Sequence, residues 1–183
     1  MSARLFVALE LPESVCSSLA AFGRAAAEHD GALRPVRTDA LHLTLAFLGH
    51  RALDEIDPAR EAVRGVRSAA PALTLGEPLW LAPRRPRVLT VALVESGGVL
   101  AALQAQVVSL LAAALPWEPE TRPFRPHATV ARVRHGWRPR VRDLPEAPRA
   151  AFVAEAVVLF RSHLGGGGPA RYEALERVGL SSQ

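Results

Sequence analysis

Two tetrapeptides in this chain place a threonine two positions after a histidine. The first is His42-Leu43-Thr44-Leu45 and the second is His127-Ala128-Thr129-Val130. A histidine with an ordinary pKa of about 6.5 can take up or release a proton at neutral pH, and a threonine hydroxyl can donate a hydrogen bond to an anion. Each tetrapeptide therefore combines a proton carrier with an oxyanion donor. Two such pairs around one phosphate would suit an in-line displacement.

Both tetrapeptides begin short apolar segments of strand character, residues 42–48 and 127–133. Because side chains alternate faces along a strand, the histidine and threonine of each pair point the same way. Alternation predicts that Arg132 lies on the opposite face from His127, so that it reaches a ligand only by its length or through a bulge. The predicted core side holds Leu43, Leu45, Phe47, Ala128 and Val130, and the predicted ligand side holds His42, Thr44, Ala46, His127, Thr129 and Ala131.

The tetrapeptides belong to a longer internal repeat of strand, long helix and motif strand, over approximately 4–49 and 88–133. Residues 4–9 match residues 88–93 at a shift of 84, and the two histidines are 85 positions apart. This repeat predicts two pseudo-symmetric lobes whose motif strands face each other across a groove. We expect an α+β fold with an antiparallel sheet and outer helices in each lobe, the lobes being intertwined in a single domain, 1–183.

The other elements are predicted from hydrophobic spacing and from proline and glycine. Pro35 restricts the strand that contains it to an edge or a bulge. The sequence does not reveal the strand order. Strands are expected at 5–9, 33–37, 72–81, 87–94, 151–160 and 170–175, and helices at about 12–30, after Asp57, and at about 99–115.

All 22 basic residues are arginine, and the chain contains no lysine. This excludes a lysine nucleophile, a Schiff-base enzyme, a P-loop lysine and a ligase that works through a nucleotidyl-lysine. Arginine is well suited to bidentate phosphate recognition. A net charge of +4 fits a nucleotide or nucleic-acid partner, and it fits a solvated arginine-rich surface equally well.

Several classes of site and location are disfavoured by the sequence. Cys16 is the only cysteine, so no internal disulfide or thiolate metal cluster can form. No Asp, Glu or Cys stands at ligand spacing near either histidine, and we therefore expect no metal and no cofactor. The sequence shows no signal peptide and no membrane-spanning stretch, which leads us to expect a cytoplasmic protein without a membrane partner.

Three segments resemble the 2H phosphoesterase superfamily: residues 4–12, Arg34 with 42–49, and 124–132. Within that superfamily the chain is similar to the bacterial and archaeal RNA 2′,3′-cyclic phosphodiesterases, long called 2′-5′ RNA ligases. Residues 159–164, Pro169 and 172–175 are similar to the closing segment of that group. The resemblance implies a bilobal α+β fold and hydrolysis of a 2′,3′-cyclic phosphate to a 2′-phosphate without a metal cofactor. Its implied partners are RNA ends or nucleotides that carry this group.

By this resemblance His42 is the general acid and His127 the general base, while Thr44 and Thr129 contact the phosphate. The pseudo-symmetry leaves the order of the two histidines open. Pro35 stands where the family often has an aromatic residue that stacks on a base, and the glycines at 165–168 are interpreted as a linker, with a lid as the alternative. Candidate substrate contacts are Arg34, Arg125, Arg132 and Tyr172.

Three alternatives remain open at this stage. The first is 2′-5′ RNA ligation by reversal at the same site, and the second is a related 2H enzyme that acts on ADP-ribose cyclic phosphate or another small ester. The third is an RNA-binding module whose motif strands only hold phosphates. Trp137, in the arginine-rich loop 134–148, is interpreted as a packing or rim residue, with base stacking as the alternative. No obligate protein partner is evident.

Overall fold

The computed structural model describes residues 1–82, 84–140, 144–163 and 171–181. The predicted glycine loop at 165–168 and Pro169 therefore lie outside the described residues. Short 3-10 turns occur at Thr38–Ala40 and Leu53–Glu55. In chain order the elements are β1 (Ser2–Glu10), α1 (Glu13–His29), β2 (Leu33–Pro35), β3 (His42–Ala52), α2 (Ile56–Arg64), β4 (Ala72–Leu81), β5 (Val88–Val94), α3 (Val99–Ala114), β6 (His127–Val133), β7 (Ala151–Val153), β8 (Ala156–His163) and β9 (Arg171–Gly179).

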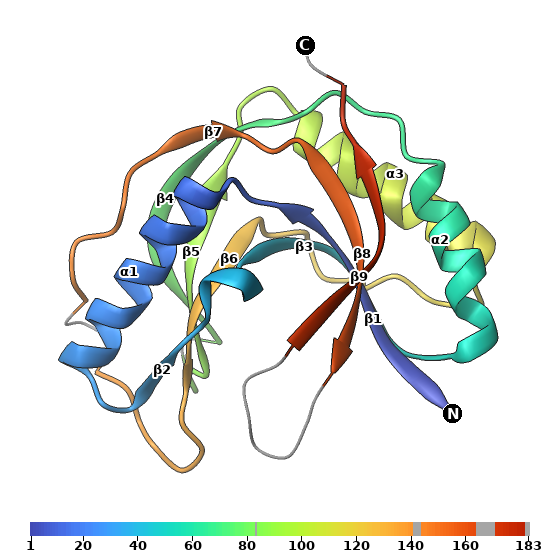
Figure 1. Ribbon diagram of the computed structural model, residues 1–183. Helices are drawn as coiled ribbons and strands as arrows, with labels where there is room; N and C mark the ends of the chain where they lie inside the picture. The colour runs from blue at the N-terminus through green and yellow to red at the C-terminus, as the bar shows by residue number, and fades with distance from the viewer. Residues whose placement is uncertain (83, 141–143, 164–170, 182–183) are drawn as a thin grey trace.

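The strands form one curved sheet in the order β7-β4-β5-β6-β3-β1-β8-β9, with β2 paired to β6 (Figure 1). The strand pairs are antiparallel, and β3 meets β6 at the pair Leu43 and Ala128. We call β3, β1, β8 and β9 the first lobe, and β6, β5, β4 and β7, together with β2, the second lobe. The predicted α+β class with antiparallel sheets and outer helices is confirmed. The motif strands, however, lie side by side at a seam, where the sequence predicted that they would face each other across a groove.

Each repeat contributes its helix to the other lobe. Helix α1 follows β1 in the chain, yet it packs against β2 and β6, while α3 follows β5 and packs against β3 and α2. Helix α2 packs against β8 and β9 of the first lobe. Figure 1 shows α1 beside the second lobe and the other two helices beside the first lobe. One cluster of buried hydrophobic residues includes side chains of both lobes.

The residue pairs between neighbouring strands show which positions of the two repeats correspond, and they correct the alignment made from sequence. In the first lobe Phe6 lies opposite Phe47, and in the second lobe Val88 lies opposite Arg132. The first strands of the two halves thus correspond at a shift of 82, where the sequence match used 84. The two shifts differ by two residues. Because this difference is even, both shifts place each side chain on the same face of its strand. Duplication of the unit stays a prediction.

Most predicted elements lie close to their observed positions. The single strand predicted at 151–160 is two strands in the structure, β7 and β8. Strand β7 pairs with β4 and β8 pairs with β1, so the two lie toward opposite ends of the sheet. Strand β3 continues beyond Gly49 to Ala52, and β9 continues to Gly179. In the described part of the chain, no helix has the length and apolar character needed to cross a bilayer.

The contact between α1 and β6 leads to a prediction about stability. A Cβ atom built on Gly23 would lie 2.5 Å from the backbone oxygen of Val130. We expect Gly23→Ala to lower the free energy of unfolding, because a clash costing about 1–3 kcal/mol exceeds the gain in helix propensity of up to about 1 kcal/mol. Urea titration measures this change. Gly31→Ala is the control, since nothing lies within 4 Å of its Cβ position, and equal stability of the two variants would contradict the prediction.

Candidate active site

Each motif strand contains a β-bulge directly after its threonine. In β3, Thr44 lies opposite Ala8 and Ala46 opposite Val7, so Leu45 is the extra residue. In β6, Val130 is extra in the same way, because Thr129 lies opposite Thr90 and Ala131 opposite Leu89. A bulge of one residue reverses the alternation of the side chains that follow it, up to the next irregularity, which in β3 lies at Leu48.

Both bulges are held from outside their strand. The carbonyl oxygen of Leu45 accepts a hydrogen bond from the Gln104 side chain of α3 at 3.3 Å. The carbonyl oxygen of Val130 accepts one from the backbone N–H of Val36 at 2.9 Å. These contacts satisfy the carbonyl groups of the two extra residues. The swapped helix α3 and the segment after β2 thus help to hold the shape of the motif strands.

The bulges correct three sequence predictions. Phe47 was expected in the core, but it is 47% exposed and lines a cavity. Ala46 and Ala131 were expected on the ligand face, but they are buried, with 6% and 0% exposure. Arg132 lines the cavity beside Thr129, and the bulge is the reason. The residues that face the ligand side in each strand are therefore His, Thr and the third residue after Thr.

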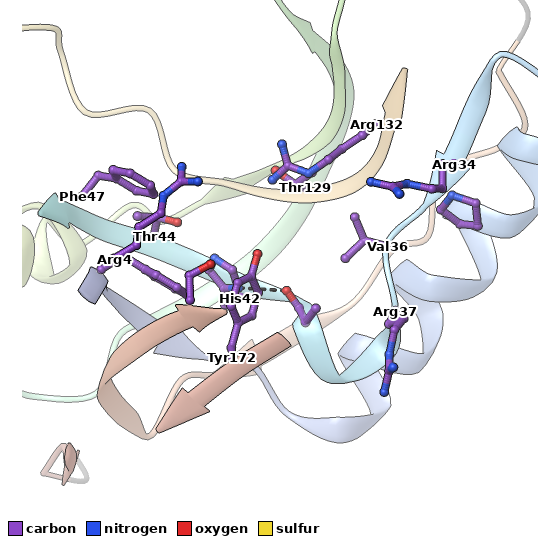
Figure 2. Close-up of a pocket in the computed structure, with 14 residues that line it drawn as sticks. Arg4, Arg34, Val36, Arg37, His42, Thr44, Phe47, Thr129, Arg132 and Tyr172 are labelled. Atoms are coloured by element: carbon purple, nitrogen blue, oxygen red, sulfur yellow. Dashed lines mark hydrogen bonds between the residues drawn. The ribbon is translucent and has the colours of Figure 1, made fainter. Parts of the chain in front are cut away.

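The seam between the lobes brings the two tetrapeptides together. Extending the antiparallel pair of Leu43 and Ala128 by one residue on each side sets His42 beside Thr129 and Thr44 beside His127. His42, Thr44 and Thr129 line a cavity of about 340 Å³ (Figure 2). His127 is not part of the cavity lining. It lies near enough that its charge helps to lower the pKa of His42.

The two histidine rings are oriented by matching hydrogen bonds. The Nδ1 of His42 lies 2.9 Å from the carbonyl oxygen of Ala40, and the Nδ1 of His127 lies 2.6 Å from that of Arg125. A carbonyl oxygen can only accept, so Nδ1 carries the proton in both rings. In the neutral form each Nε2 is therefore unprotonated and can take a proton, whereas the charged form can donate one.

The surroundings of His42 oppose its protonation. Burial is the largest cause and lowers the pKa of His42 to about 4, with the charges of Arg132 and His127 acting in the same direction. The hydrogen bond to Ala40 acts the other way, because it favours the charged ring. His42 is consequently neutral at neutral pH in the unliganded protein.

The wall contributed by the first lobe is aromatic. The ring of Phe6 lies 4.8 Å from the ring of His42, and Tyr172 meets the same ring edge-on at 5.3 Å. Phe47 continues this wall, and the guanidinium of Arg4 lies 4.9 Å from its ring centre. Tyr172, a candidate from the sequence, lines the cavity. A flat apolar surface with one cation at its edge suits a planar ring.

The wall contributed by the second lobe is cationic. Arg34 in β2 lies opposite Arg132 in β6, and both guanidinium groups reach the cavity (Figure 2). Arg37 also lines the cavity, while its guanidinium pairs with Asp39 at 2.5 Å. The Arg125 side chain is exposed and is not part of the lining, so of this residue only the carbonyl group is brought to the site.

Five of the polar and aromatic lining residues were not singled out from the sequence as ligand contacts. Phe47 and Phe6 were assigned to strands without a role at the site, and only the bulge at Leu45 would have revealed Phe47. Arg4 and Ser162 are opposite partners in β1 and β8, a pairing that the sequence did not reveal. Arg4 and Ser162 reach the site because of their positions in the sheet, and their residue types alone do not indicate it. The missed residues are Arg4, Phe6, Arg37, Phe47 and Ser162.

Other nucleophiles and metal ligands are sparse in the described part of the chain. Its His, Cys, Asp and Glu side chains form no group of three or more that could hold a metal ion. The Cys16 thiol is buried, and burial raises its pKa to about 11, so this thiol is protonated at neutral pH. The site therefore offers His42, which lines the cavity, and His127, which lies close to it, as its proton carriers.

Comparison with known proteins identifies the family. A family model described as the 2′-5′ RNA ligase superfamily matches residues 11–166. The chain belongs to this superfamily, the LigT-like 2H phosphoesterases. By sequence, no curated protein matches it.

Solved structures from the superfamily resemble the chain along its whole length. Escherichia coli LigT, complexed with 3′-AMP, has 25% identity and a TM-score of 0.78, with 100% of both chains covered. A protein described as a phosphoesterase has 26% identity and the same TM-score and coverage. The protein TT0787 of Thermus thermophilus has 28% identity and a TM-score of 0.73, with 98% of this chain and 99% of that chain covered.

The low pKa of His42 makes stability depend on pH. Between about pH 6.5, the unfolded pKa of histidine, and the folded pKa of about 4, the unfolded chain binds more protons than the folded protein. The free energy of unfolding therefore falls as pH is lowered through this window. We expect His42→Gln to reduce the stability difference between pH 7.5 and pH 4.5 by about 2–3 kcal/mol.

Guanidinium unfolding at the two pH values measures this effect. His50→Gln is the matched control, because His50 is an exposed residue of the same strand. An unchanged pH dependence in His42→Gln would show that His42 does not resist protonation in the folded protein.

Proposed function

We propose that this protein hydrolyses 2′,3′-cyclic phosphates at RNA ends or on nucleotides, giving 2′-phosphates without a metal ion. The observation that carries the proposal is the pair of matched histidines at the seam, each holding its Nδ1 proton on a carbonyl group and leaving Nε2 free. His42 lines the cavity and His127 lies close to it, so the two rings together can transfer two protons in one displacement. The aromatic and arginine walls suit a nucleoside and its phosphates.

The proposed reaction uses four side chains. The Nε2 of His127 takes a proton from a water molecule, whose oxygen attacks the phosphorus atom. As that bond forms, the bond from phosphorus to the 3′-oxygen breaks, and His42 gives this oxygen a proton. The hydroxyls of Thr44 and Thr129 donate to the non-bridging oxygens and stabilise the charge that develops there. The products are a 2′-phosphate and a free 3′-hydroxyl.

The assignment of His42 as the acid places a condition on the substrate. Because His42 is neutral in the free protein, a bound phosphate must first raise its pKa and so bring in a proton. The negative charge of the phosphodiester favours this change. Without this rise in pKa, the neutral ring of His42 suits the role of base, and His127 would then be the acid. The proposal therefore couples substrate binding to proton uptake at His42.

Similarity to E. coli LigT supports a nucleotide substrate. Structures of that protein complexed with 3′-AMP and with phosphate have 25% and 24% identity to this chain, and the first covers all of both chains. The phosphate complex has a TM-score of 0.72. We propose that the cavity here takes the same kind of group, with the phosphate at His42, Thr44 and Thr129 and the base on the Phe47 wall.

Turnover in EDTA tests the proposed reaction. We expect a nucleoside 2′,3′-cyclic phosphate to give the 2′-phosphate, and His42→Gln or His127→Gln to lower kcat by about 10²–10⁴-fold. His50→Gln, on the same strand as His42, is expected to keep its rate. Product chromatography separates the 2′- and 3′-phosphates. Near-normal turnover by His127→Gln, or activity lost in EDTA, would contradict the two-histidine mechanism.

Ligation by reversal is tested in the same assay. The same groups would catalyse joining if the 5′-hydroxyl of a second RNA took the place of the water. Adding such an RNA to the RNA with a cyclic end compares the two directions. A joined 2′-5′ product in excess over the 2′-phosphate would replace hydrolysis by ligation as the reaction of this site.

A further inference from the structure

The cationic wall of the cavity continues into two loops of the second lobe. Beyond Arg132, the backbone N–H of Val133 donates to the carbonyl of Arg87, and that of Arg134 donates to the carbonyl of Ala32. The loop after β6 and the turn between β4 and β5 therefore begin next to the cavity. Figure 1 shows both at the same end of the second lobe. We call residues 84–87 and 134–140 the basic tip.

The arginine side chains of the basic tip are not paired with carboxylates in salt bridges among the described residues. The tip itself contains no Asp or Glu. Elsewhere Arg51, Arg64 and Arg177 each pair with a carboxylate. Like charges gathered on one surface repel one another, and a polyanion relieves this repulsion. The arginines of the tip are Arg84, Arg85, Arg87, Arg134, Arg138 and Arg140.

The second loop of the tip is anchored in the fold. Asp30 is buried, and its carboxylate accepts hydrogen bonds from the backbone N–H groups of Ala32 at 2.9 Å and Arg140 at 2.5 Å. The guanidinium of Arg134 donates to the carbonyl of Gly31 at 3.1 Å. Both ends of the loop are thus tied to the end of α1. The tip is consequently a defined surface, with a turn at Gly136, whose φ is 80°.

An aromatic residue stands within this surface. Trp137 is 58% exposed, and its backbone N–H donates to the carbonyl of Arg134 at 3.1 Å. An exposed indole among arginines suits single-stranded nucleic acid, whose bases stack on aromatic rings while its phosphates bind the cations. Since strand residues rise about 3.3 Å each and Val130 is an extra residue, Arg134, just beyond the end of β6, lies about 13 Å from Thr129. Several nucleotides of extended RNA span this length.

We propose that the basic tip binds the single-stranded RNA that precedes the cyclic phosphate, so that the preferred substrate is an RNA end and not a free nucleotide. This proposal rests on the proposed function for its cyclic end. The reacting phosphate lies at the seam, the next phosphates lie along Arg34 and Arg132, and the strand continues over Trp137 and Arg138. Salt weakens this part of the binding, because each phosphate contact releases counterions.

A double variant of the tip tests the proposal. Arg85→Gln/Arg138→Gln lies outside the cavity lining and is expected to leave turnover of a cyclic mononucleotide unchanged. On an RNA of about ten nucleotides with the same end, we expect kcat/KM to fall about tenfold. For this RNA the slope of log affinity against log salt should fall by about 1.4, since each lost contact contributes about 0.7 for a single strand. Trp137→Leu should weaken RNA binding about tenfold.

The control is Arg24→Gln/Arg149→Gln, which removes the same charge at exposed residues outside the tip. Equal effects of the control and the tip variant on the RNA would overturn the proposal, as would a wild-type protein that turns over the mononucleotide as efficiently as the RNA. If the wild type turns over neither substrate, the proposed function fails, and the salt dependence of RNA binding to the two variants still decides the role of the tip.

Discussion

The site depends on the one extra residue that directly follows the threonine of each motif strand. Plain alternation would place an alanine after each histidine and threonine on the ligand face, and it would bury Phe47 and turn Arg132 away. The bulges at Leu45 and Val130 reverse this arrangement. A bulge also increases the local twist of its strand, which fits the contact of β3 and β6 at the pair Leu43 and Ala128. The Leu45 and Val130 carbonyls bond to Gln104 and Val36, so packing around each motif strand supports its geometry.

Similar backbones with different side chains explain how two histidines can take different roles. At corresponding register positions the first lobe has Phe6 and Phe47, while the second has Val88 and Arg132. His42 therefore lies against aromatic rings, and burial lowers its pKa to about 4. The cations stand on the opposite wall and continue into the basic tip. The asymmetry gives the cavity an aromatic side and a cationic side, which suits the planar base and the phosphates of the proposed substrate.

Local sequence patterns predicted the elements well because propensity and hydrophobic spacing act over short distances. The two His-x-Thr pairs, the strands that carry them and the antiparallel α+β class all followed from such patterns. The helix exchange, the strand order and the role of Phe47 did not, since each depends on contacts between residues far apart in the chain. Arg125 shows the converse case. It is adjacent to the motif in sequence, yet its side chain is exposed, and only its carbonyl group contacts the histidine.

The central claim is that His42 and His127 act on one ligand from matched orientations. Nitrogen-15 NMR of the imidazole rings tests it most directly, in a titration with a non-hydrolysable nucleotide phosphate. We predict that both neutral rings carry their proton on Nδ1 in the free protein. Both Nε2 signals should then shift with a single dissociation constant, and His42 should gain a proton as the ligand binds. A shift confined to one histidine, or a neutral ring protonated on Nε2, would contradict the account.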